Sequence, residues 1–462
     1  MTAANSRKSS PDAVLRSDIP GIVWPAVGSD ASAHLQSLLF QMTHSQWLGE
    51  AELQFRQLYQ VKQLMRHALS TVPLYREALS HLDPDVLDWE IFRALPVLNR
   101  SELQSGFDVL QSSAVPPSHG AVTEGQTSGS TGMPIRFLQT AATKLFWNAL
   151  TLREHLWHER DFSGKLAAIR VKVEAGHHPD WGMPVSALYR SGPGATLNVR
   201  TDIEKQLDWL LRENPDYLLT HASNLAALAE LTLRRGVKLP RLRQARSFSE
   251  TLRPGLRELV REAWGVGVAD VYSCEEAGHI ALQCPLHEHY HVQTENLVVE
   301  ILDETGRPCA PGETGRVVLT TLHNFAMPLI RYEIGDYAEV GDVCDCGRGL
   351  PVLQRIHGRR RNMIVLPDGR RHWPSFPRIR YTGIAPVKQI RIVQRSLSDI
   401  DAIYTAERPL TPSETQGMVG AIQEALGFPF KVMLQAVDEM PRQANMKFED
   451  IISEVAVPGQ NG

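Results

Sequence analysis

Several features are scarce in this sequence of 462 residues, and each absence narrows the class of protein. No stretch approaches eighteen uninterrupted apolar residues, which argues against a membrane-spanning helix. The net charge is only -4, without a long basic stripe or an acidic tail, so we expect no nucleic-acid partner. Residues Met1 to Asp18 are polar and hold no apolar run, so a secretory signal is not expected. These absences predict a soluble protein with no membrane partner, located in the cytoplasm.

Cysteine is also scarce, with five residues in the chain. An odd count in a chain without a secretory signal argues against a disulfide framework. The placement of the cysteines is more informative than their number, because all of them lie in one stretch and two form a Cys-x-Cys pair. They are Cys274, Cys284, Cys309, Cys344 and Cys346.

Hydrophobic residues make up 43% of the chain, which is ample for a large core, and the length predicts two or more domains. Residues 1–30, rich in Ser, Ala and Asp, are typical of a flexible lead-in. From about 120 to 340, short β-forming runs alternate with helical periodicity, which predicts a layered α/β domain over 31–358. The pattern changes after Gly358, and we expect a small mobile α+β lid over 359–462.

The individual elements follow from the same periodicities. Consecutive strands between 296 and 340 predict an antiparallel sub-sheet, and Pro73 is expected to end the helical region that precedes it. Asn99 is a candidate helix cap. The expected strands are 166–171, 217–219, 268–272, 297–302, 316–322, 336–340, 388–394, 401–404 and 430–435, and the expected helices lie within 33–82 and at 201–213, 224–235 and 414–426.

The clearest motif is the string from Thr127 to Pro134, which reads Thr-Ser-Gly-Ser-Thr-Gly-Met-Pro. Its two glycines permit backbone geometries that are closed to other residues, and four hydroxyl side chains surround them. Such a loop directs N–H groups and hydroxyls at phosphate oxygens. It is not a Walker A loop, because the Gly-Lys-Ser/Thr ending is absent. We expect the phosphate contacts from Thr127, Ser128, Gly129, Ser130, Thr131 and Gly132, with Thr131 also counted as catalytic.

This string resembles the phosphate loop of adenylate-forming enzymes, the acyl-CoA synthetases and adenylation domains. The phrases at residues 72–76 (Val-Pro-Leu-Tyr-Arg) and 95–98 (Leu-Pro-Val-Leu) resemble one branch, the phenylacetate–coenzyme A ligases and capsule-biosynthesis ligase-like proteins. The resemblance runs from about residue 40 to about 455. It implies a large adenylate-forming domain with a mobile C-terminal lid, and ATP and Mg²⁺ as cofactors.

The resemblance also assigns roles to a string that follows an expected strand, Tyr272-Ser273-Cys274-Glu275-Glu276. By position, Glu276 is the Mg²⁺ carboxylate and a catalytic residue, while Tyr272 packs on adenine, with Ser273 beside it. A single glutamate suffices chemically, because Mg²⁺ takes few protein carboxylates and completes its shell with water and phosphate. Glu275 departs from the family pattern, since a second carboxylate near ATP repels phosphate unless it faces away. Ser249 and Glu250 match the segment that lines adenine.

Three further residues complete the expected nucleotide site. Asp336 ends a string, Arg331 to Asp336, that resembles the ribose motif, and an aspartate can accept hydrogen bonds from both hydroxyls of a diol. Arg359 matches the phosphate-contacting arginine of the hinge, where Asn362 replaces a more usual aspartate. Lys447 matches the catalytic lysine of the C-terminal loop, where it stabilises charge as pyrophosphate leaves. Met446 precedes it in place of the usual glycine.

The cysteines and nearby histidines predict a metal site. Cys284 and the histidines 287, 289 and 291 lie some 60 residues before the Cys344-Asp345-Cys346-Gly347 turn. Thiolate and imidazole ligands suit tetrahedral Zn²⁺. The expected ligands are Cys284, His291, Cys344 and Cys346, with His289 as the rival of His291. Four protein ligands imply a closed, structural site. The alternative is a set of reduced, unliganded cysteines.

The reaction implied is attack of a small carboxylic acid, which the resemblance suggests is aromatic, on the α-phosphorus of ATP. The acceptor of the acyl group is the thiol of coenzyme A, with an amine or a carrier-protein thiol as the alternative, and a homodimer is a candidate assembly. A nucleotide-binding protein that has lost catalysis is the rival class, favoured by Glu275, Asn362 and Met446.

Overall fold

The computed structural model describes residues 15–127, 134–374, 376, 378–438, 440 and 450–455. Within this part of the chain, no helix combines the length and the apolar content that crossing a bilayer requires. The expected lead-in is described only from residue 15, where the backbone N–H of Arg16 donates to the carbonyl of Leu188 at 2.8 Å.

The ends of the first five helices follow local sequence signals. Helix α1 begins after Ser29, whose hydroxyl accepts from the backbone N–H of Ser32. Helix α2 ends before Pro73, as expected, and Asn99 forms a capping box with Glu102 at the start of α5. The helices are α1 (Asp30–Ser45), α2 (Glu50–Thr71), α3 (Pro73–Ala78), α4 (Trp89–Ala94) and α5 (Arg100–Ser105).

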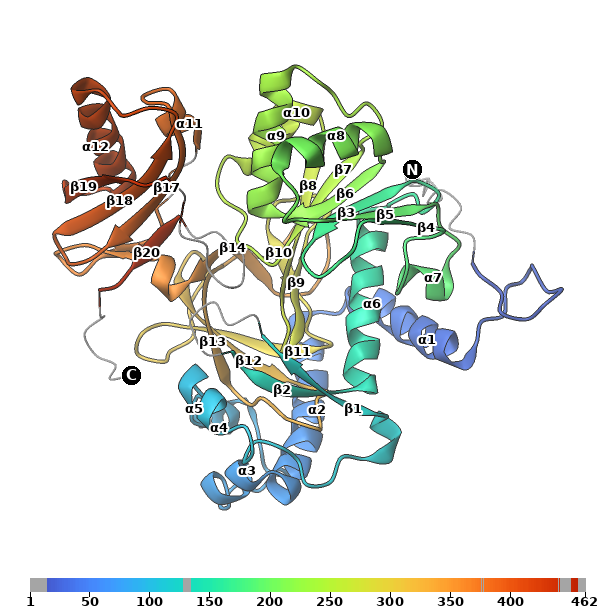
Figure 1. The fold of residues 1–462 in the computed structure, drawn as a ribbon. Helices are drawn as coiled ribbons and strands as arrows, with labels where there is room; N and C mark the ends of the chain where they lie inside the picture. Colours follow the sequence, from blue (N-terminus) through green and yellow to red (C-terminus); the bar gives the residue numbers. More distant parts are fainter. Residues whose placement is uncertain are drawn as a thin grey trace, which may run out of the picture.

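Among the described residues, twelve strands form one mixed sheet in the order β11-β12-β13-β14-β10-β9-β8-β7-β6-β3-β5-β4 (Figure 1). The strands β5, β3, β6, β7 and β8 run parallel, and the pairs outside this block are antiparallel. The antiparallel sub-sheet expected between 296 and 340 therefore forms one end of a continuous sheet, as β11, β12 and β13. The strands are β3 (Leu166–Arg170), β4 (Gly176–His178), β5 (Gly194–Asn198), β6 (Tyr217–His221), β7 (Gln244–Phe248), β8 (Gly267–Cys274), β9 (Gly278–Gln283), β10 (Tyr290–Val292), β11 (Leu297–Leu302), β12 (Thr314–Thr321), β13 (Tyr332–Val340) and β14 (Val352–Arg359).

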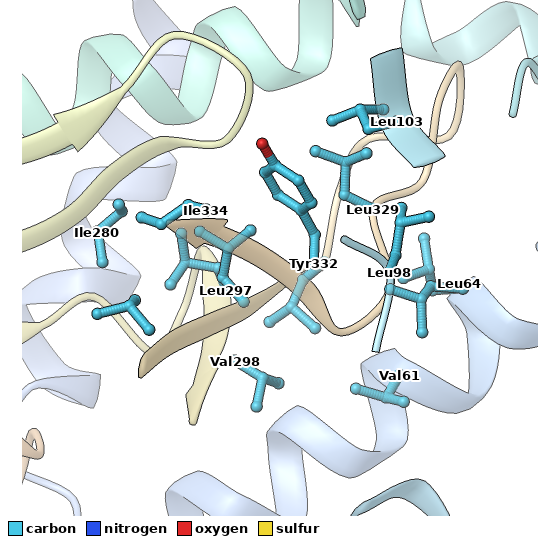
Figure 2. Packing of buried hydrophobic residues seen from close by; sticks show 14 of the residues in the cluster. Val61, Leu64, Leu98, Leu103, Ile280, Leu297, Val298, Leu329, Tyr332 and Ile334 are labelled. Atoms are coloured by element: carbon cyan, nitrogen blue, oxygen red, sulfur yellow. The ribbon is translucent and has the colours of Figure 1, made fainter. Parts of the chain in front are cut away.

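Helices cover this sheet and bury two apolar cores. The parallel half packs against α8, α9 and α10 through residues such as Leu210, Leu225 and Val260. The antiparallel half packs against α2 to α5, where Tyr332 lies among Leu98, Leu103 and Leu329 (Figure 2). The remaining elements of this part are the hairpin β1 (Val122–Gln126) and β2 (Arg136–Thr140), the helices α6 (Ala141–Trp157), α7 (Val185–Leu188), α8 (Ile203–Glu213), α9 (Ala222–Arg235) and α10 (Leu256–Trp264), and the 3-10 turn η1 (Pro117–His119).

The chain after Arg359 builds a separate core. Strands β17 and β18 are antiparallel, and β20 and β19 extend them in parallel on either side. Helix α12 covers this sheet and buries Met418, Ile422 and Leu426. The elements are η2 (Arg360–Asn362), β15 (Ile364–Val365), β16 (Arg371–His372), α11 (Arg378–Thr382), β17 (Val387–Gln394), β18 (Asp399–Ala406), α12 (Pro412–Leu426), β19 (Lys431–Ala436) and β20 (Ile451–Ser453). The expected α/β class is confirmed.

Candidate functional site

The expected phosphate loop emerges from the β1–β2 hairpin. Thr127 closes the stem of the loop, because its backbone N–H donates to the carbonyl of Ile135 at 2.9 Å, and its hydroxyl accepts from the N–H of Ile135 at 2.9 Å. These two bonds fix the point from which the loop leaves the hairpin. The expected site residues Ser128, Gly129, Ser130, Thr131, Gly132 and Lys447 lie outside the described residues.

Glu276 occupies the turn between β8 and β9, and its side chain is directed inward. It is only 4% exposed, and the hydroxyl of Tyr332 lies 3.4 Å from Oε1. In the described part of the chain no arginine or lysine forms an ion pair with this carboxylate. A buried carboxylate without a counter-charge is costly, so the position favours a bound cation. The neighbouring Glu275 is exposed, and its carbonyl accepts from Nε2 of Gln139 at 2.8 Å.

Asp336 lies between two residues that the sequence also assigns to the nucleotide. The hydroxyl of Tyr272 donates to Oδ2 of Asp336 at 2.9 Å, and Nε of Arg359 lies 3.0 Å from Oδ1. Burial and the adjacent Asp336 raise the pKa of Tyr272 well above its ordinary value, so the phenol stays protonated and donates. The strands β8, β13 and β14 thus bring together three residues separated by up to 87 positions (359 − 272 = 87).

The positive charge of Arg359 also interacts with the carboxylate of Glu276. Asp336 and, more weakly, Glu276 raise the pKa of Arg359 above its ordinary value, so the guanidinium is positive near both carboxylates. Arg359 also donates from Nη1 to the carbonyl of Ile334 at 3.2 Å. The next turn, η2, is tied to β20 because Nδ2 of Asn362 donates to the carbonyl of Ile451 at 2.8 Å. Asn362 therefore serves as a contact between the hinge segment and the C-terminal sheet.

Ser249 and Glu250 follow the carboxyl end of β7, at the edge where ligands bind in sheets of this type. Ser249 has a positive φ of 68°, and the carboxylate of Glu250 accepts from the backbone N–H of Ser223 at 2.8 Å. Glu250 therefore holds the first turn of α9 against this loop. Ser273 is half-buried in β8, where the pairing with β9 shifts register after Tyr272.

A small pocket opens beside Glu276 at the first turns of α6. Lys144 and Trp147 of α6 line it together with Asn296, Asn324 and Glu276. Lys144, Asn296 and Asn324 belong to none of the motifs that predict the site. No local signal marks them, because they come from elements that meet only in the folded sheet.

The expected zinc residues form a second cluster. The sulfurs of Cys284 and Cys344 are 3.9 Å apart, and Sγ of Cys346 lies 3.4 Å from Nε2 of His291. Around a tetrahedral Zn²⁺, two thiolates are separated by about 3.7 Å and a thiolate and an imidazole nitrogen by about 3.5 Å, given the usual bond lengths. Nδ1 of His291 faces the carbonyl of Leu350 at 3.3 Å, which orients Nε2 toward the cysteines.

A fifth donor lies in the same cluster. Ligand atoms of Cys284, His289, His291 and Cys344 all lie within 4.8 Å of one another. Nε2 of His289 is buried and has no hydrogen-bond partner within the described residues, as is common for an atom that binds a metal. The donor set therefore fits Zn²⁺, with two thiolates, His291, and either Cys346 or His289 in the fourth position.

Comparison with known proteins identifies relatives along most of the chain. No family model matches it. The phenylacetate–coenzyme A ligase of Escherichia coli K12 is 24% identical over 364 residues, which cover 75% of this chain and 81% of that protein. The enzyme of the same name from Pseudomonas putida is 22% identical over 68% of this chain and 72% of that protein. That of Thermus thermophilus is 29% identical, over 35% of this chain and only 38% of the relative.

Solved structures share the fold. A 2-hydroxyisobutyryl-CoA ligase in its postadenylation state matches with a TM-score of 0.69 at 19% identity, over 89% of this chain and 92% of that one. The same ligase in its thioesterification state matches with a TM-score of 0.57, over 89% and 91%. An anthranilate CoA ligase in complex with anthranoyl-AMP matches with a TM-score of 0.52 at 18% identity, over 70% and 64%. The chain is therefore similar in sequence to the phenylacetate–coenzyme A ligases along most of its length and shares its fold with solved CoA ligases.

Proposed function

We propose that this protein is a ligase that uses ATP to convert a small carboxylic acid into its acyl-AMP, releases pyrophosphate, and transfers the acyl group to coenzyme A. The observation that carries the proposal is the pairing of Asp336 with Tyr272 and Arg359 next to the buried Glu276, which forms no ion pair within the described residues. The first group suits a ribose diol, and the second suits a cation that accompanies phosphate. The similarity of this chain to the phenylacetate–coenzyme A ligases supports the same reaction.

The chain performs this reaction by positioning and electrostatics, without a nucleophilic side chain. Asp336 accepts the ribose hydroxyls, and Tyr272 and Arg359 keep its carboxylate ionised and in place. Thr127 fixes the stem of the loop that carries the phosphates. Glu276 holds Mg²⁺, which neutralises phosphate charge when bound. Lys447 places its ammonium at the α-phosphate while the acid oxygen attacks and pyrophosphate departs.

The acid is proposed to be aromatic, because the homologues act on phenylacetate. Pyrophosphate release measured over a panel of aryl, alkyl and amino acids, with hydroxylamine as the trap, tests the proposal. Release with one acid class supports it, and replacing hydroxylamine by coenzyme A, an amine or a carrier protein identifies the acceptor. ATP binding without release for every acid would instead support an inactive nucleotide-binding protein.

We also propose a structural Zn²⁺ held by Cys284, His291, Cys344 and Cys346. These residues come from the β9–β10 connection, β10 and the loop before β14, so the ion would join chain segments that are otherwise 60 residues apart (344 − 284 = 60). The separations of 3.9 Å and 3.4 Å within the cluster support this set.

Removal of the metal is expected to destabilise the protein. Purified protein should contain about one zinc per chain, and Cys344→Ser should lose the zinc and lower the melting temperature by about 5 °C or more. Cys309→Ser, a cysteine outside the cluster, is the control and should keep both. A Cys346→Ser protein that retains its zinc while His289→Ala loses it would contradict the proposed fourth ligand.

Three further expectations concern the domain boundary, the location and the assembly of the protein. We propose that residue 358 separates the large domain from the C-terminal lid, because β14 ends at Arg359 and the third core begins at Ile364. We also propose a cytoplasmic location and a homodimer, which fractionation and light scattering of the purified protein test directly.

A further inference from the structure

Arg100, the first residue of α5, is held beside the strand that carries Tyr332. The backbone N–H of Leu98 donates to the carbonyl of Arg331 at 3.0 Å, and the carbonyl of Leu98 accepts from the N–H of Glu333 at 2.9 Å. These two hydrogen bonds lie on either side of Tyr332 in β13. The start of α5 is therefore fixed against this residue.

The guanidinium of Arg100 acts on the hydroxyl of Tyr332. Leu98 and Leu103, which flank Arg100 in the sequence, pack beside Tyr332 (Figure 2). Burial and the charge of Glu276 raise the pKa of Tyr332 well above its ordinary value, and the positive charge of Arg100 lowers it. The Tyr332 hydroxyl also lies 3.4 Å from Oε1 of Glu276. The guanidinium and the carboxylate proposed to hold Mg²⁺ thus both act on this one hydroxyl.

Arg100 has no counter-charge among the described residues. The side chain is half-buried, and its Nε is buried without a hydrogen-bond partner in that part of the chain. Acidic side chains of the adjoining segments have other partners. The Glu102 carboxylate accepts from the backbone N–H of Asn99 at 2.7 Å, and Glu333 pairs with Nη1 of Arg316 at 2.6 Å. A buried charged donor without an acceptor is costly, so the position favours a bound anion.

The phosphate chain of the nucleotide is the anion that fits this position. At the ribose end of the site, Asp336 and Tyr272 already have Arg359 as their neighbouring cation. Arg100 acts at the other end, beside Glu276, where the proposed Mg²⁺ accompanies the phosphates. The planar fork of a guanidinium matches two phosphate oxygens at once, which makes arginine well suited to this contact.

We infer that Arg100 binds the β- and γ-phosphates of ATP and the pyrophosphate that they become. The inference rests on the proposed function and deepens it, because none of the motifs that predict the site includes Arg100. As the acid oxygen bonds to the α-phosphorus, the bond from that phosphorus to the bridging oxygen breaks. The negative charge that leaves with pyrophosphate then lies beside the guanidinium. AMP and acyl-AMP lack these two phosphates, so Arg100 serves only the first half-reaction.

Arg100→Gln tests the inference, because glutamine keeps a polar side chain and removes the charge. The affinity for ATP, and that for pyrophosphate measured as product inhibition, should each fall by about 10- to 100-fold, the usual effect of losing a hydrogen bond to a charged group. The affinity for AMP, and the rate of thioester formation from supplied acyl-AMP, should stay within about twofold of wild type, because neither involves the two phosphates.

Three comparisons separate phosphate binding from a structural role. Arg93→Gln is the matched control and should change none of these quantities, because Arg93 is an exposed arginine of the neighbouring helix α4, 5.7 Å from the centroid of the Trp89 ring. Arg100→Lys keeps the charge and should recover part of the affinity for ATP. Nucleotide-free Arg100→Gln should melt at the same or a higher temperature than wild type, since it removes an unpaired, partly buried charge.

Several results would overturn the inference. They are an equal loss of affinity for AMP and ATP, inhibition by pyrophosphate that is unchanged in Arg100→Gln, and a lowered melting temperature of that variant without nucleotide. A wild-type protein that binds ATP but releases no pyrophosphate with any acid would overturn the proposed function instead. The difference between ATP and AMP binding would still measure the Arg100 contact in that case.

Discussion

Replacing Glu276 by glutamine is expected to lower the rate of pyrophosphate release by about 10²- to 10³-fold, the usual cost of losing a preorganised electrostatic group. The side chain is buried and forms no ion pair within the described residues, with Arg359 as a nearby positive charge, so the position suits the bound Mg²⁺ proposed above. Glutamine keeps the size of the side chain and removes only the negative charge. The concentration of Mg²⁺ needed for half-maximal rate should therefore rise as the rate falls.

The neighbouring glutamate supplies a matched control. Glu275 is exposed, and Glu275→Gln should change the rate by less than about threefold, because a solvent-exposed charge is strongly screened. Thermal melting in the absence of nucleotide gives an independent check. Glu276→Gln should melt at the same or a higher temperature, since it removes a buried charge. A variant that releases pyrophosphate at the wild-type rate, or that loses activity only because it unfolds, would contradict the assigned role.

The position of these two glutamates illustrates what the sequence alone can and cannot provide. The motif order identifies Glu276 by resemblance, and the strand before it is expected because its residues alternate and favour β structure. The orientation of each side chain depends on the register of the β8–β9 turn, which is set by pairing with distant strands. Whether the Glu275 carboxylate lies near bound phosphate therefore depends on the conformation of the folded turn. In that turn the Glu275 side chain is exposed.

The sheet and the Cys/His cluster also combine features that the sequence predicts with features that depend on the folded chain. Periodicity within a segment predicts nine of the twenty strands in the described part of the chain, and the helices α8, α9 and α12, to within a few residues. It does not predict that the parallel and antiparallel strands form one sheet, because β8–β9 pairing joins the two halves through long-range contacts. Cysteine and histidine spacing predicts the residues of the Cys/His cluster, with His289 as a candidate, whereas the closeness of His289 to Cys284 and Cys344 depends on the folded β9–β10 connection.

The sequence does not predict the tertiary contacts that residues within a motif make. Tyr332 belongs to a motif read for its aspartate, yet its ring fills the core and its hydroxyl approaches Glu276 (Figure 2). Arg331 of the same motif pairs with Glu300, at 3.0 Å from Nε, so its role is to hold the strand rather than to bind nucleotide. A motif therefore mixes residues that touch the ligand with residues that hold those residues in place.

Lys447→Ala is expected to lower acyl-AMP formation by about 10²- to 10³-fold, because the ammonium offsets charge that develops only as pyrophosphate leaves the α-phosphorus. Thioester formation from supplied acyl-AMP involves no pyrophosphate departure and should stay within about threefold of wild type. Lys447→Arg should be intermediate, since arginine keeps the charge but presents a planar group of different reach. Single-turnover measurements of the two half-reactions, with coenzyme A added only to the second, distinguish these outcomes.

Lys431→Ala is the matched control for this experiment, because Lys431 is an exposed lysine at the start of β19 in the same C-terminal sheet. It should leave both half-reactions unchanged. Loss of both half-reactions to the same degree in Lys447→Ala would show that the lysine supports the C-terminal part as a whole rather than the departing pyrophosphate.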